Sequence, residues 1–226
     1  MDLHGKHAVV TGGSNGIGFA LASLLTSSGV RVTNLDQAAP AEQTEGVTHL
    51  RCDISNLDDV RAALAQTNGA IDLLVLNAGV IRRGPVLAHP ENEFDLLFGV
   101  NAKGTWLMMK EGAPLLSKHG IVLHVSSYRA GQTVDDPGLY AASKAAGEQL
   151  VRCAAAGDPG FTTKIARLGP TDTAIARHGV EGDALKRKEA VMRSADEIAA
   201  MILELATGPH GTLTYDPSAD AYAFGA

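Results

Sequence analysis

A tyrosine and a lysine stand four positions apart, as Tyr140 and Lys144, in a segment whose composition favours a helix. Side chains four residues apart lie on the same face of a helix, so a phenol and an ammonium group would be neighbours there. An ordinary tyrosine has a pKa of ~10, and a cation one turn away stabilises the phenolate and lowers that pKa. The pair could therefore exchange a proton with a bound molecule at neutral pH.

Polar side chains also follow two apolar runs. Ser126 and Ser127 come directly after residues 121–125, and Asn77 comes directly after residues 72–76. In a parallel sheet such positions meet at the carboxyl edge, where open α/β folds bind ligands. Asn101 lies inside a long helical stretch, where an asparagine is unfavourable unless its side chain is used.

A glycine-rich turn links the first apolar run to the first helical stretch; it contains Gly12, Ser14, Asn15, Gly16, Ile17 and Gly18. Glycines let the backbone approach a pyrophosphate, and the N-terminus of the following helix supplies N–H donors. Asp36 ends the next apolar run, close to the roughly 20-residue offset of an acid that binds an adenosine ribose. Its carboxylate would repel a 2′-phosphate and residue 37 is glutamine, which favours NAD over NADP as the cofactor.

Apolar runs alternate with helical patterns along the whole chain. The expected strands are 7–11, 30–35, 48–54, 72–76, 121–125, 164–168 and 211–215, and the expected helices are 17–28, 57–67, 91–117 with a bend near Pro114, 139–155, 183–192 and 196–206. This alternation predicts an α/β fold over residues 1–226: a single doubly wound Rossmann-type domain with a mostly parallel sheet of six to seven strands.

Composition excludes several classes of function. The 226 residues carry a formal charge of −6 with no basic run longer than residues 186–188, so we expect no nucleic-acid partner. The uncharged stretch 8–30 is interrupted by polar residues and glycines, so we expect no membrane span. Cys52 and Cys153 lack the spacing of a zinc site; we expect no metal and predict buried, reduced thiols in a cytoplasmic protein.

In this order and spacing, the motifs resemble the short-chain dehydrogenase/reductase (SDR) family. Residues 11–18 resemble its TGxxxGxG turn, residues 77–79 its NAG motif, and residues 168–173 its PGxxxT segment. The resemblance implies the catalytic residues Asn101, Ser127, Tyr140 and Lys144. To the glycine turn and Asp36 it adds, as cofactor-binding residues, Asp53, Ile54, Asn77, Ala78, Gly79, Tyr140, Lys144, Pro170, Thr171 and Thr173.

The resemblance also implies a role for each catalytic residue. Tyr140 would be the general acid/base, Lys144 would lower the Tyr140 pKa and hold the nicotinamide ribose, and Ser127 would stabilise the substrate oxygen. Asn101 would open its helix locally. The position of Gly131 leaves the choice between Ser126 and Ser127 open, although the distance to Tyr140 favours Ser127.

The substrate pocket is less well defined by the sequence. By family position it would be bordered by Val80, Arg82, Tyr128 and Arg129. The two arginines could hold a carboxylate or phosphate, or could be solvated loop residues. The lid over the substrate, residues 174–193, is short for the family, which implies an open pocket that tolerates varied substrates. A homodimer or homotetramer is implied by resemblance alone.

The leading hypothesis is an NAD-dependent oxidoreductase acting on the CH–OH group, an alcohol dehydrogenase or carbonyl reductase whose small-molecule substrates are a secondary alcohol and its ketone. An NADP-dependent biosynthetic ketoreductase is the second reading, disfavoured by Asp36. A non-catalytic NAD-sensing protein is the third, because function resides in sites and not in folds. The complete set of four catalytic residues argues against a sensor, which has no need of proton transfer.

Overall fold

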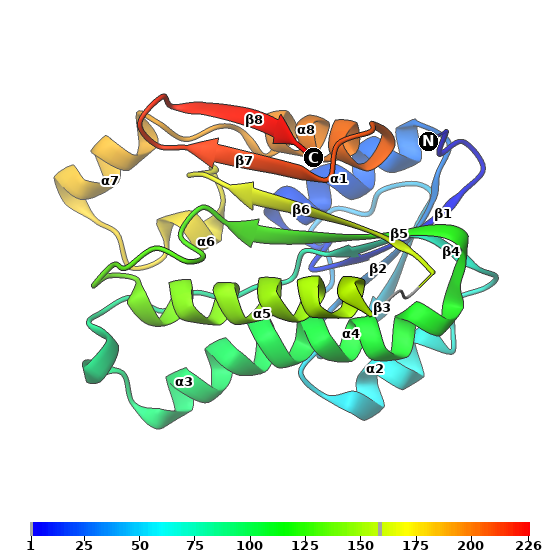
Figure 1. Cartoon of the computed structure of the whole chain (residues 1–226), viewed down its shortest axis with the longest axis horizontal. Helices are drawn as coiled ribbons and strands as arrows, with labels where there is room; N and C mark the ends of the chain where they lie inside the picture. The colour runs from blue at the N-terminus through cyan, green and yellow to red at the C-terminus, as the bar shows by residue number, and fades with distance from the viewer. Residues whose placement is uncertain (1, 158–159) are drawn as a thin grey trace.

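The computed structural model describes residues 2–157 and 160–226, and within them eight strands form one sheet in the order β3-β2-β1-β4-β5-β6-β7-β8. All neighbouring strands are parallel except the pair β7 and β8 (Figure 1). The strands are β1 (His7–Thr11), β2 (Arg31–Asp36), β3 (Val47–Arg51), β4 (Ile71–Leu76), β5 (Leu116–Ser127), β6 (Thr162–Leu168), β7 (Thr212–Asp216) and β8 (Ala221–Gly225). Strand order reverses direction between β1 and β4, which opens a crevice at their carboxyl ends.

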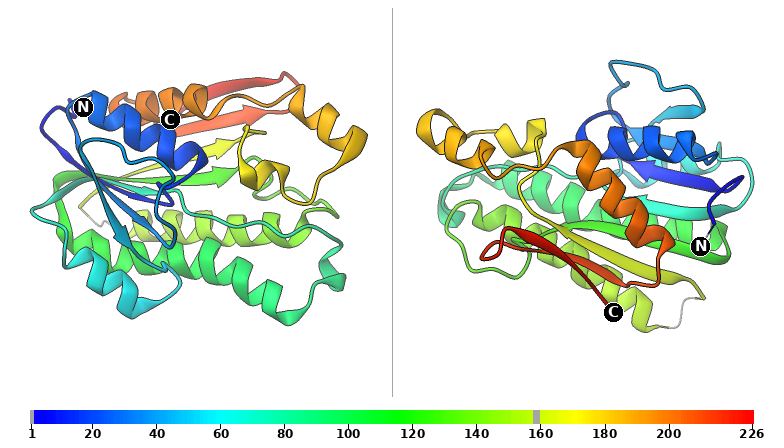
Figure 2. Two further views of the ribbon diagram at one scale, coloured as in Figure 1. Left: turned by 180° about the vertical axis from the view of Figure 1, so that it is seen from behind. Right: turned by 90° about the horizontal axis from the view of Figure 1, so that it is seen from above.

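Helices cover both faces of this sheet (Figures 1 and 2). They are α1 (Gly16–Ser27), α2 (Leu57–Leu64), α3 (Glu91–Phe98), α4 (Thr105–Gly112), α5 (Gly138–Ala156), α6 (Ala174–Arg177), α7 (Gly182–Glu189) and α8 (Ala195–Thr207). One buried cluster joins the sheet to α1 and α8, and a second joins it to α2, α4 and α5. Because both faces are covered, the central strands read as continuous apolar runs.

The expected helix over residues 91–117 is divided. Between α3 and α4 the chain forms a π-helical turn, Gly99–Gly104, in which Asn101 is buried. Such turns insert one extra residue into a helix and often occur at functional sites. The local opening of the helix expected at Asn101 is therefore present. At Pro114 the chain does not bend within a helix; a short 3₁₀ turn, Ala113–Leu115, ends the helical region and leads into β5.

Two expectations were wrong: the number of strands among the described residues and the burial of Cys153. The sheet has eight strands, not six or seven, because Ala221–Gly225 pairs antiparallel with β7. The pairing is supported by aromatic packing, with the rings of Tyr215 and Tyr222 5.2 Å apart. Cys153 was expected to be buried, but only Cys52 is; Cys153 is exposed on α5. In the part of the chain that the structure describes, no helix is long and apolar enough to cross a membrane.

Candidate active site

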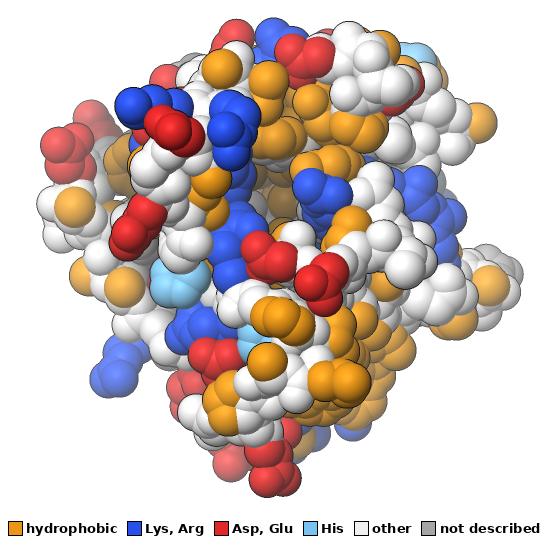
Figure 3. Space-filling model, turned by 90° about the vertical axis from the view of Figure 1, so that its left-hand side faces the viewer, with side chains coloured by type: hydrophobic (Ala, Val, Ile, Leu, Met, Phe, Trp, Pro, Cys, Tyr) orange, Lys and Arg blue, Asp and Glu red, His pale blue; other side chains and the backbone are white. Residues whose placement is uncertain are grey.

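A cavity of about 1140 Å³ opens at the carboxyl edge of the sheet. The glycine turn, the ends of β2, β4, β5 and β6, and the segment that contains α6 and α7 all contribute to its walls. Figure 3 shows this face of the molecule, with a hollow at its centre and Lys and Arg side chains around it. The edge predicted from the ends of the apolar runs is therefore where the cavity lies. Across residues 2–157 and 160–226, no group of His, Cys, Asp and Glu is arranged to hold a metal ion.

The glycine turn packs tightly against the segment that follows β4. Gly12 has a φ of +69°, and a Cβ there would lie 2.8 Å from the Ala78 Cα, closer than real Cβ contacts allow. Asn77 fastens the two segments together, since its Nδ2 donates to the Thr11 carbonyl at 2.9 Å and to the Gly12 carbonyl at 3.1 Å. Only glycine therefore fits at Gly12, because a side chain would push these segments apart.

Side chains from β2 hold the other side of the turn. The Asn34 Oδ1 accepts from the Gly13 N–H at 2.8 Å, and the Asp36 carboxylate accepts from the N–H groups of Ser14 at 3.1 Å and Ala38 at 3.0 Å. Asp36 lines the cavity as well. Asn34 was not predicted, although a fully buried asparagine inside a strand is the kind of residue whose side chain must find partners.

The N-terminus of α1 differs from those of α2 and α8. Asn56 and Ser194 cap the latter two helices with side-chain hydrogen bonds, whereas Asn15 makes no such bond and the first turn of α1 carries no acidic residue. Gly16 and Ile17 in that turn line the cavity. Uncapped N–H groups and the helix dipole attract an anion such as a phosphate. The site thus fits the pyrophosphate of a dinucleotide at α1 and its ribose at Asp36.

Most predicted cofactor residues lie in the cavity wall: Gly12, Asn15, Gly16, Ile17, Asp36, Ile54, Asn77, Ala78, Gly79, Tyr140, Lys144, Pro170, Thr171 and Thr173. Among the described residues, Ser14, Gly18 and Asp53 do not contribute to that wall. The Ser14 hydroxyl donates to the Ala38 carbonyl at 2.6 Å, and Gly18 lies beneath the turn. Asp53 accepts from the Ser55 N–H and hydroxyl at 2.9 and 2.7 Å.

Tyr140 and Ser127 both line the cavity. Burial raises the pKa of Tyr140 above its ordinary value, and the nearby Ser127 side chain and the charge of Arg83 oppose this only in part. The Ser127 Oγ also accepts from the Arg129 N–H at 3.2 Å. The neighbouring Ser126 hydroxyl is buried without a hydrogen-bond partner among the described residues. Ser127 is thus the serine in contact with Tyr140.

Lys144 lies one turn after Tyr140 and is almost fully buried. Its Nζ donates to the Val125 carbonyl at 3.0 Å, and burial lowers the pKa of Lys144 to about 8. The expectation that Lys144 lowers the Tyr140 pKa is therefore not met in this structure, where that pKa is raised. The reason is burial: low solvation favours the neutral phenol, and the charges that act on Tyr140 are those of Tyr128 and Arg83, not that of Lys144.

Asn101 lies beside the cavity and not in its wall. The side-chain Oδ1 accepts from the Val80 N–H, and the Nδ2 donates to the Val80 carbonyl and to the Ser143 hydroxyl, each at 2.9 Å. The Ser143 hydroxyl in turn donates to the Tyr140 carbonyl at 2.8 Å. In this structure Asn101 is thus a positioning residue that joins the loop after β4 to the helix that carries Tyr140.

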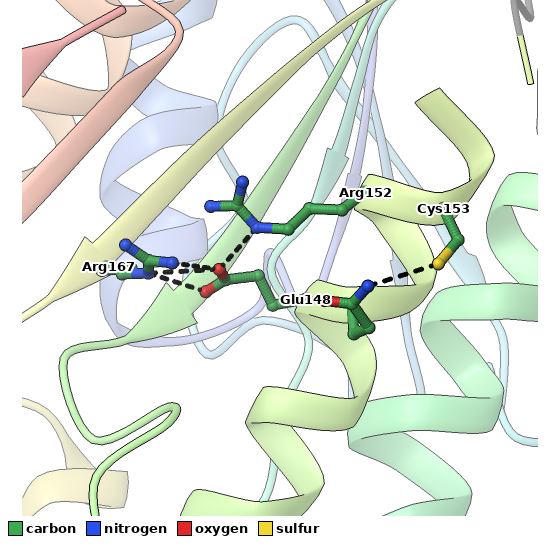
Figure 4. Close-up of polar contacts among 5 residues, drawn as sticks. Glu148, Arg152, Cys153 and Arg167 are labelled. Carbon is green, nitrogen blue, oxygen red and sulfur yellow. Dashed lines mark hydrogen bonds and ion pairs between the residues drawn. The ribbon is translucent and has the colours of Figure 1, made fainter. Parts of the chain in front are cut away.

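The face of α5 that carries Lys144 is further anchored by Glu148, one turn later. Glu148 was not singled out in the sequence. Its carboxylate accepts from the Nε of Arg152 at 2.9 Å and from the Nε of Arg167 on β6 at 3.0 Å (Figure 4). His124 of β5 is buried nearby, and burial followed by the charge of Lys144 lowers the His124 pKa to about 3, so it is neutral. The anchor therefore ties α5 to the sheet one turn beyond Lys144.

The predicted substrate residues are separated by the structure. Val80, Tyr128 and Arg129 line the cavity. Arg82 is absent from the described cavity wall; its Nε lies 3.7 Å from Glu93 and its NH1 donates to the Ile81 carbonyl at 2.8 Å. The adjacent Arg83 lines the cavity instead, as do Arg187 and Lys188 from the predicted lid, which the sequence analysis did not select.

Comparisons with known proteins agree with this arrangement. Residues 6–182 match the family model described as short chain dehydrogenase. The chain is 31% identical to D-threitol dehydrogenase of Mycolicibacterium smegmatis, over 91% of this chain and 87% of that protein. It is also 31% identical to the cyclic-di-GMP-binding biofilm dispersal mediator protein of Escherichia coli, over 92% of each. The chain spans only 60–61% of the length of the first curated relatives it matches.

Solved structures share the fold over most of this chain. A short chain dehydrogenase from Burkholderia cenocepacia, crystallised in complex with NADP, has a TM-score of 0.82 and 26% identity over 94% of this chain and 88% of that one. Levodione reductase, at 22% identity, covers 96% of this chain with a TM-score of 0.85 and supports the fold alone. The single Rossmann-like α/β domain predicted from the sequence is confirmed.

The lowered pKa of Lys144 predicts a pH-dependent contribution to stability. Between pH 8 and the ordinary pKa of lysine, ~10.4, the unfolded chain holds this proton and the folded protein does not. Since the unfolded state then binds more protons, raising the pH stabilises the fold through this group. The free energy of unfolding of the wild type, relative to Lys144→Met, should rise by up to about 2 kcal/mol between pH 7.5 and 9.5 in urea titrations.

The exposed Lys118, replaced by methionine, is the matched control. If the difference between the wild type and Lys144→Met is the same at both pH values, or changes as it does for Lys118→Met, the lowered pKa is contradicted.

Proposed function

The chain belongs to the short-chain dehydrogenase family, and from that we propose that it is an NAD(H)-dependent oxidoreductase that interconverts a secondary alcohol and a ketone. One observation carries the proposal: Tyr140 and Ser127 line the same cavity as the glycine turn and the uncapped start of α1. A proton donor and a dinucleotide cradle in one cavity are the two parts that such a reaction requires.

The bound nicotinamide supplies the hydride donor or acceptor. In the direction of reduction the Tyr140 hydroxyl gives its proton to the substrate oxygen, and its raised pKa keeps the phenol protonated and ready to do so. Ser127 hydrogen-bonds the same oxygen and stabilises the negative charge that develops on it. The Lys144 ammonium, held at the Val125 carbonyl, would hold the ribose hydroxyls of the cofactor. In oxidation the Tyr140 phenol would first release its proton to solvent, and the resulting phenolate would receive the proton of the alcohol.

NAD is the proposed cofactor because of Asp36. The cavity wall beside it includes Leu35, Gln37 and Ala38, whereas Arg51, the β3 partner of Asp36, does not contribute to the described wall. Three similar proteins were crystallised with NADP or NADPH, which favours the alternative of an NADP-dependent ketoreductase. The carboxylate of Asp36 distinguishes the two, because it accepts hydrogen bonds from ribose hydroxyls and repels a phosphate.

A binding protein without catalysis is the second candidate function. It is supported by the similarity to the cyclic-di-GMP-binding biofilm dispersal mediator protein, whose name describes binding. The two candidates differ in turnover: an enzyme changes absorbance at the NADH band with some member of a panel of alcohols or ketones, whereas a sensor binds the cofactor and turns over none of them.

Tyr140→Phe tests the proposed mechanism. The ring is kept and the proton is removed, so kcat should fall by roughly 10²- to 10⁴-fold, while the affinity for NADH, measured by fluorescence titration, stays within twofold. Tyr215→Phe is the matched control, because its hydroxyl bonds Asp220 at 2.9 Å, away from the described cavity wall. Turnover of Tyr140→Phe near that of the wild type removes Tyr140 from the mechanism.

Asp36→Asn tests the choice of cofactor. The substitution removes the charge but keeps an oxygen for the Ser14 N–H. The wild type should prefer NAD in kcat/KM, and Asp36→Asn should raise kcat/KM for NADP by roughly tenfold, equivalent to about 1.4 kcal/mol of repulsion. Glu42→Gln makes the same charge change on an exposed loop and should leave the preference unaltered. Equal use of both cofactors by the wild type is the outcome that rejects NAD specificity.

A homodimer through α4 and α5 is part of the proposal. The two helices lie side by side (Figure 1), and they expose Trp106 and Leu150, with 41% and 37% of their surfaces accessible. Large exposed apolar side chains on one face indicate an interface. Light scattering should give twice the monomer mass for the wild type and the monomer mass for Trp106→Glu. Leu87→Glu, at an exposed residue elsewhere, should remain dimeric. A monomeric wild type contradicts the dimer.

A further inference from the structure

The end of the cavity near Tyr140 is lined with basic side chains. Arg83 comes from the loop after β4, Arg129 from the loop after β5, and Lys188 from α7. Arg187 lines the same cavity. The chain as a whole carries a formal charge of −6, so this gathering of positive charge runs against the overall balance. Figure 3 shows Lys and Arg side chains bordering the central hollow.

These cations are poorly neutralised by the protein itself. Arg83 lies 3.5 Å from Asp136 and donates from Nε to the His178 carbonyl at 2.9 Å. Across residues 2–157 and 160–226, neither Arg129 nor Lys188 has a carboxylate within ion-pairing distance.

The partners of these two side chains are neutral instead. Arg129 donates to the Gln132 Oε1 at 3.2 Å and lies over the Tyr128 ring, 4.7 Å from its centroid. Lys188 donates to the Ala176 carbonyl. A guanidinium has five N–H donors and an ammonium three, so both groups retain donors for a ligand.

Hydrogen bonds bring two of the cations together, because Arg83 and Lys188 donate to the carbonyls of His178 and Ala176, two residues apart. Burial, followed by the charges of Arg83 and Arg129, lowers the pKa of Lys188 to about 8 against the opposing charge of Asp136. Partly desolvated like charges destabilise the folded protein unless an anion is bound among them. Such groups of Arg and Lys are typical of sites for carboxylates and phosphates.

The cluster is placed to reach a substrate. Arg83 and Arg129 line the same cavity as Tyr140, and Arg129 follows Ser127 by two residues. The charge of Arg83 also acts on the Tyr140 pKa. The phosphates of a dinucleotide would be held by the glycine turn and α1, to which Arg83, Arg129 and Lys188 do not belong. A ligand group between the three cations is therefore a neighbour of the reacting carbon.

We propose that Arg83, Arg129 and Lys188 bind an oxyanion of the substrate, a carboxylate, phosphate or sulfonate, so that the natural substrates are acidic hydroxy or keto compounds. The inference rests on the proposed function, because it places this anion beside the carbon that exchanges hydride. It also gives a role to two residues, Arg83 and Lys188, that the sequence pattern did not select.

The first experiment compares an acid with its ester. The wild type should reduce acetoacetate with a higher kcat/KM than methyl acetoacetate. In Lys188→Gln and Arg129→Gln, KM for acetoacetate should rise roughly 10- to 100-fold while kcat/KM for the ester changes less than threefold. Lys186→Gln removes a charge from an exposed position on the same helix and should match the wild type. Equal kinetics on acid and ester, with variants that lower both alike, overturn the proposal.

The second experiment does not depend on turnover. Inorganic phosphate is titrated into the protein saturated with NAD, and binding is followed by ³¹P NMR at constant ionic strength. Binding should be lost in Lys188→Gln and Arg129→Gln and kept in Lys186→Gln. If no substrate is turned over, the oxidoreductase proposal fails, and this titration alone decides for or against the anion site. Phosphate binding that is the same in all variants, or variants that lose affinity for NAD instead, overturns it.

Discussion

The geometry of the site depends on the hydrogen bonds that the buried Asn101 side chain makes. Its amide links the backbone of Val80 to the Ser143 hydroxyl, which bonds the Tyr140 carbonyl, so a continuous hydrogen-bonded path joins the loop after β4 to the start of α5. The π-helical turn is what brings this amide to both partners. Loss of such a buried bond leaves its partners unsatisfied, at a cost of about 1–3 kcal/mol per group. The packing of α5 against the π-helical turn is also close at Asn101, because a Cβ at Gly147 would lie 2.3 Å from the Asn101 carbonyl oxygen.

The two ends of the cavity differ in charge, although Asp136, which pairs with Arg83, and Glu181 also line it. Asp36 is at one end, hydrogen-bonded to the glycine turn, and Arg83, Arg129 and Lys188 are at the other. A dinucleotide that binds along the cavity would place its ribose hydroxyls against the acid and leave the cations for a second ligand. Between them, Tyr140 is buried enough to remain a phenol. The charges of the site would therefore determine where each ligand lies along the cavity, as well as contribute to its binding.

Much of this arrangement could be predicted from the sequence, because it follows from periodicity and from glycines at fixed offsets. The parallel strands and the edge at which Ser127 and Asn77 emerge belong to this group, whereas the opening of the helix at Asn101 was implied by the resemblance to the family. The sequence could not distinguish Arg82 from Arg83, because a loop has no period that assigns adjacent side chains to different sides. The run of basic residues 186–188 likewise contains Lys188, which lies near other cations, and Lys186, which is exposed to solvent.

The direction of the Tyr140 pKa shift also required the structure, since it is decided by burial, a property of tertiary packing. The chemistry and the recognition in this protein rest on different kinds of structure. Asn101 and Lys144 are set in packed helices and are buried, whereas Arg83, Arg129 and Lys188 come from two loops and the short helix α7, and none of these three residues belongs to the buried clusters. Substitutions in the second group cost the fold little. Point mutations at these three residues could therefore change the preferred substrate and keep the same proton transfer, without a prior mutation that raises the free energy of unfolding.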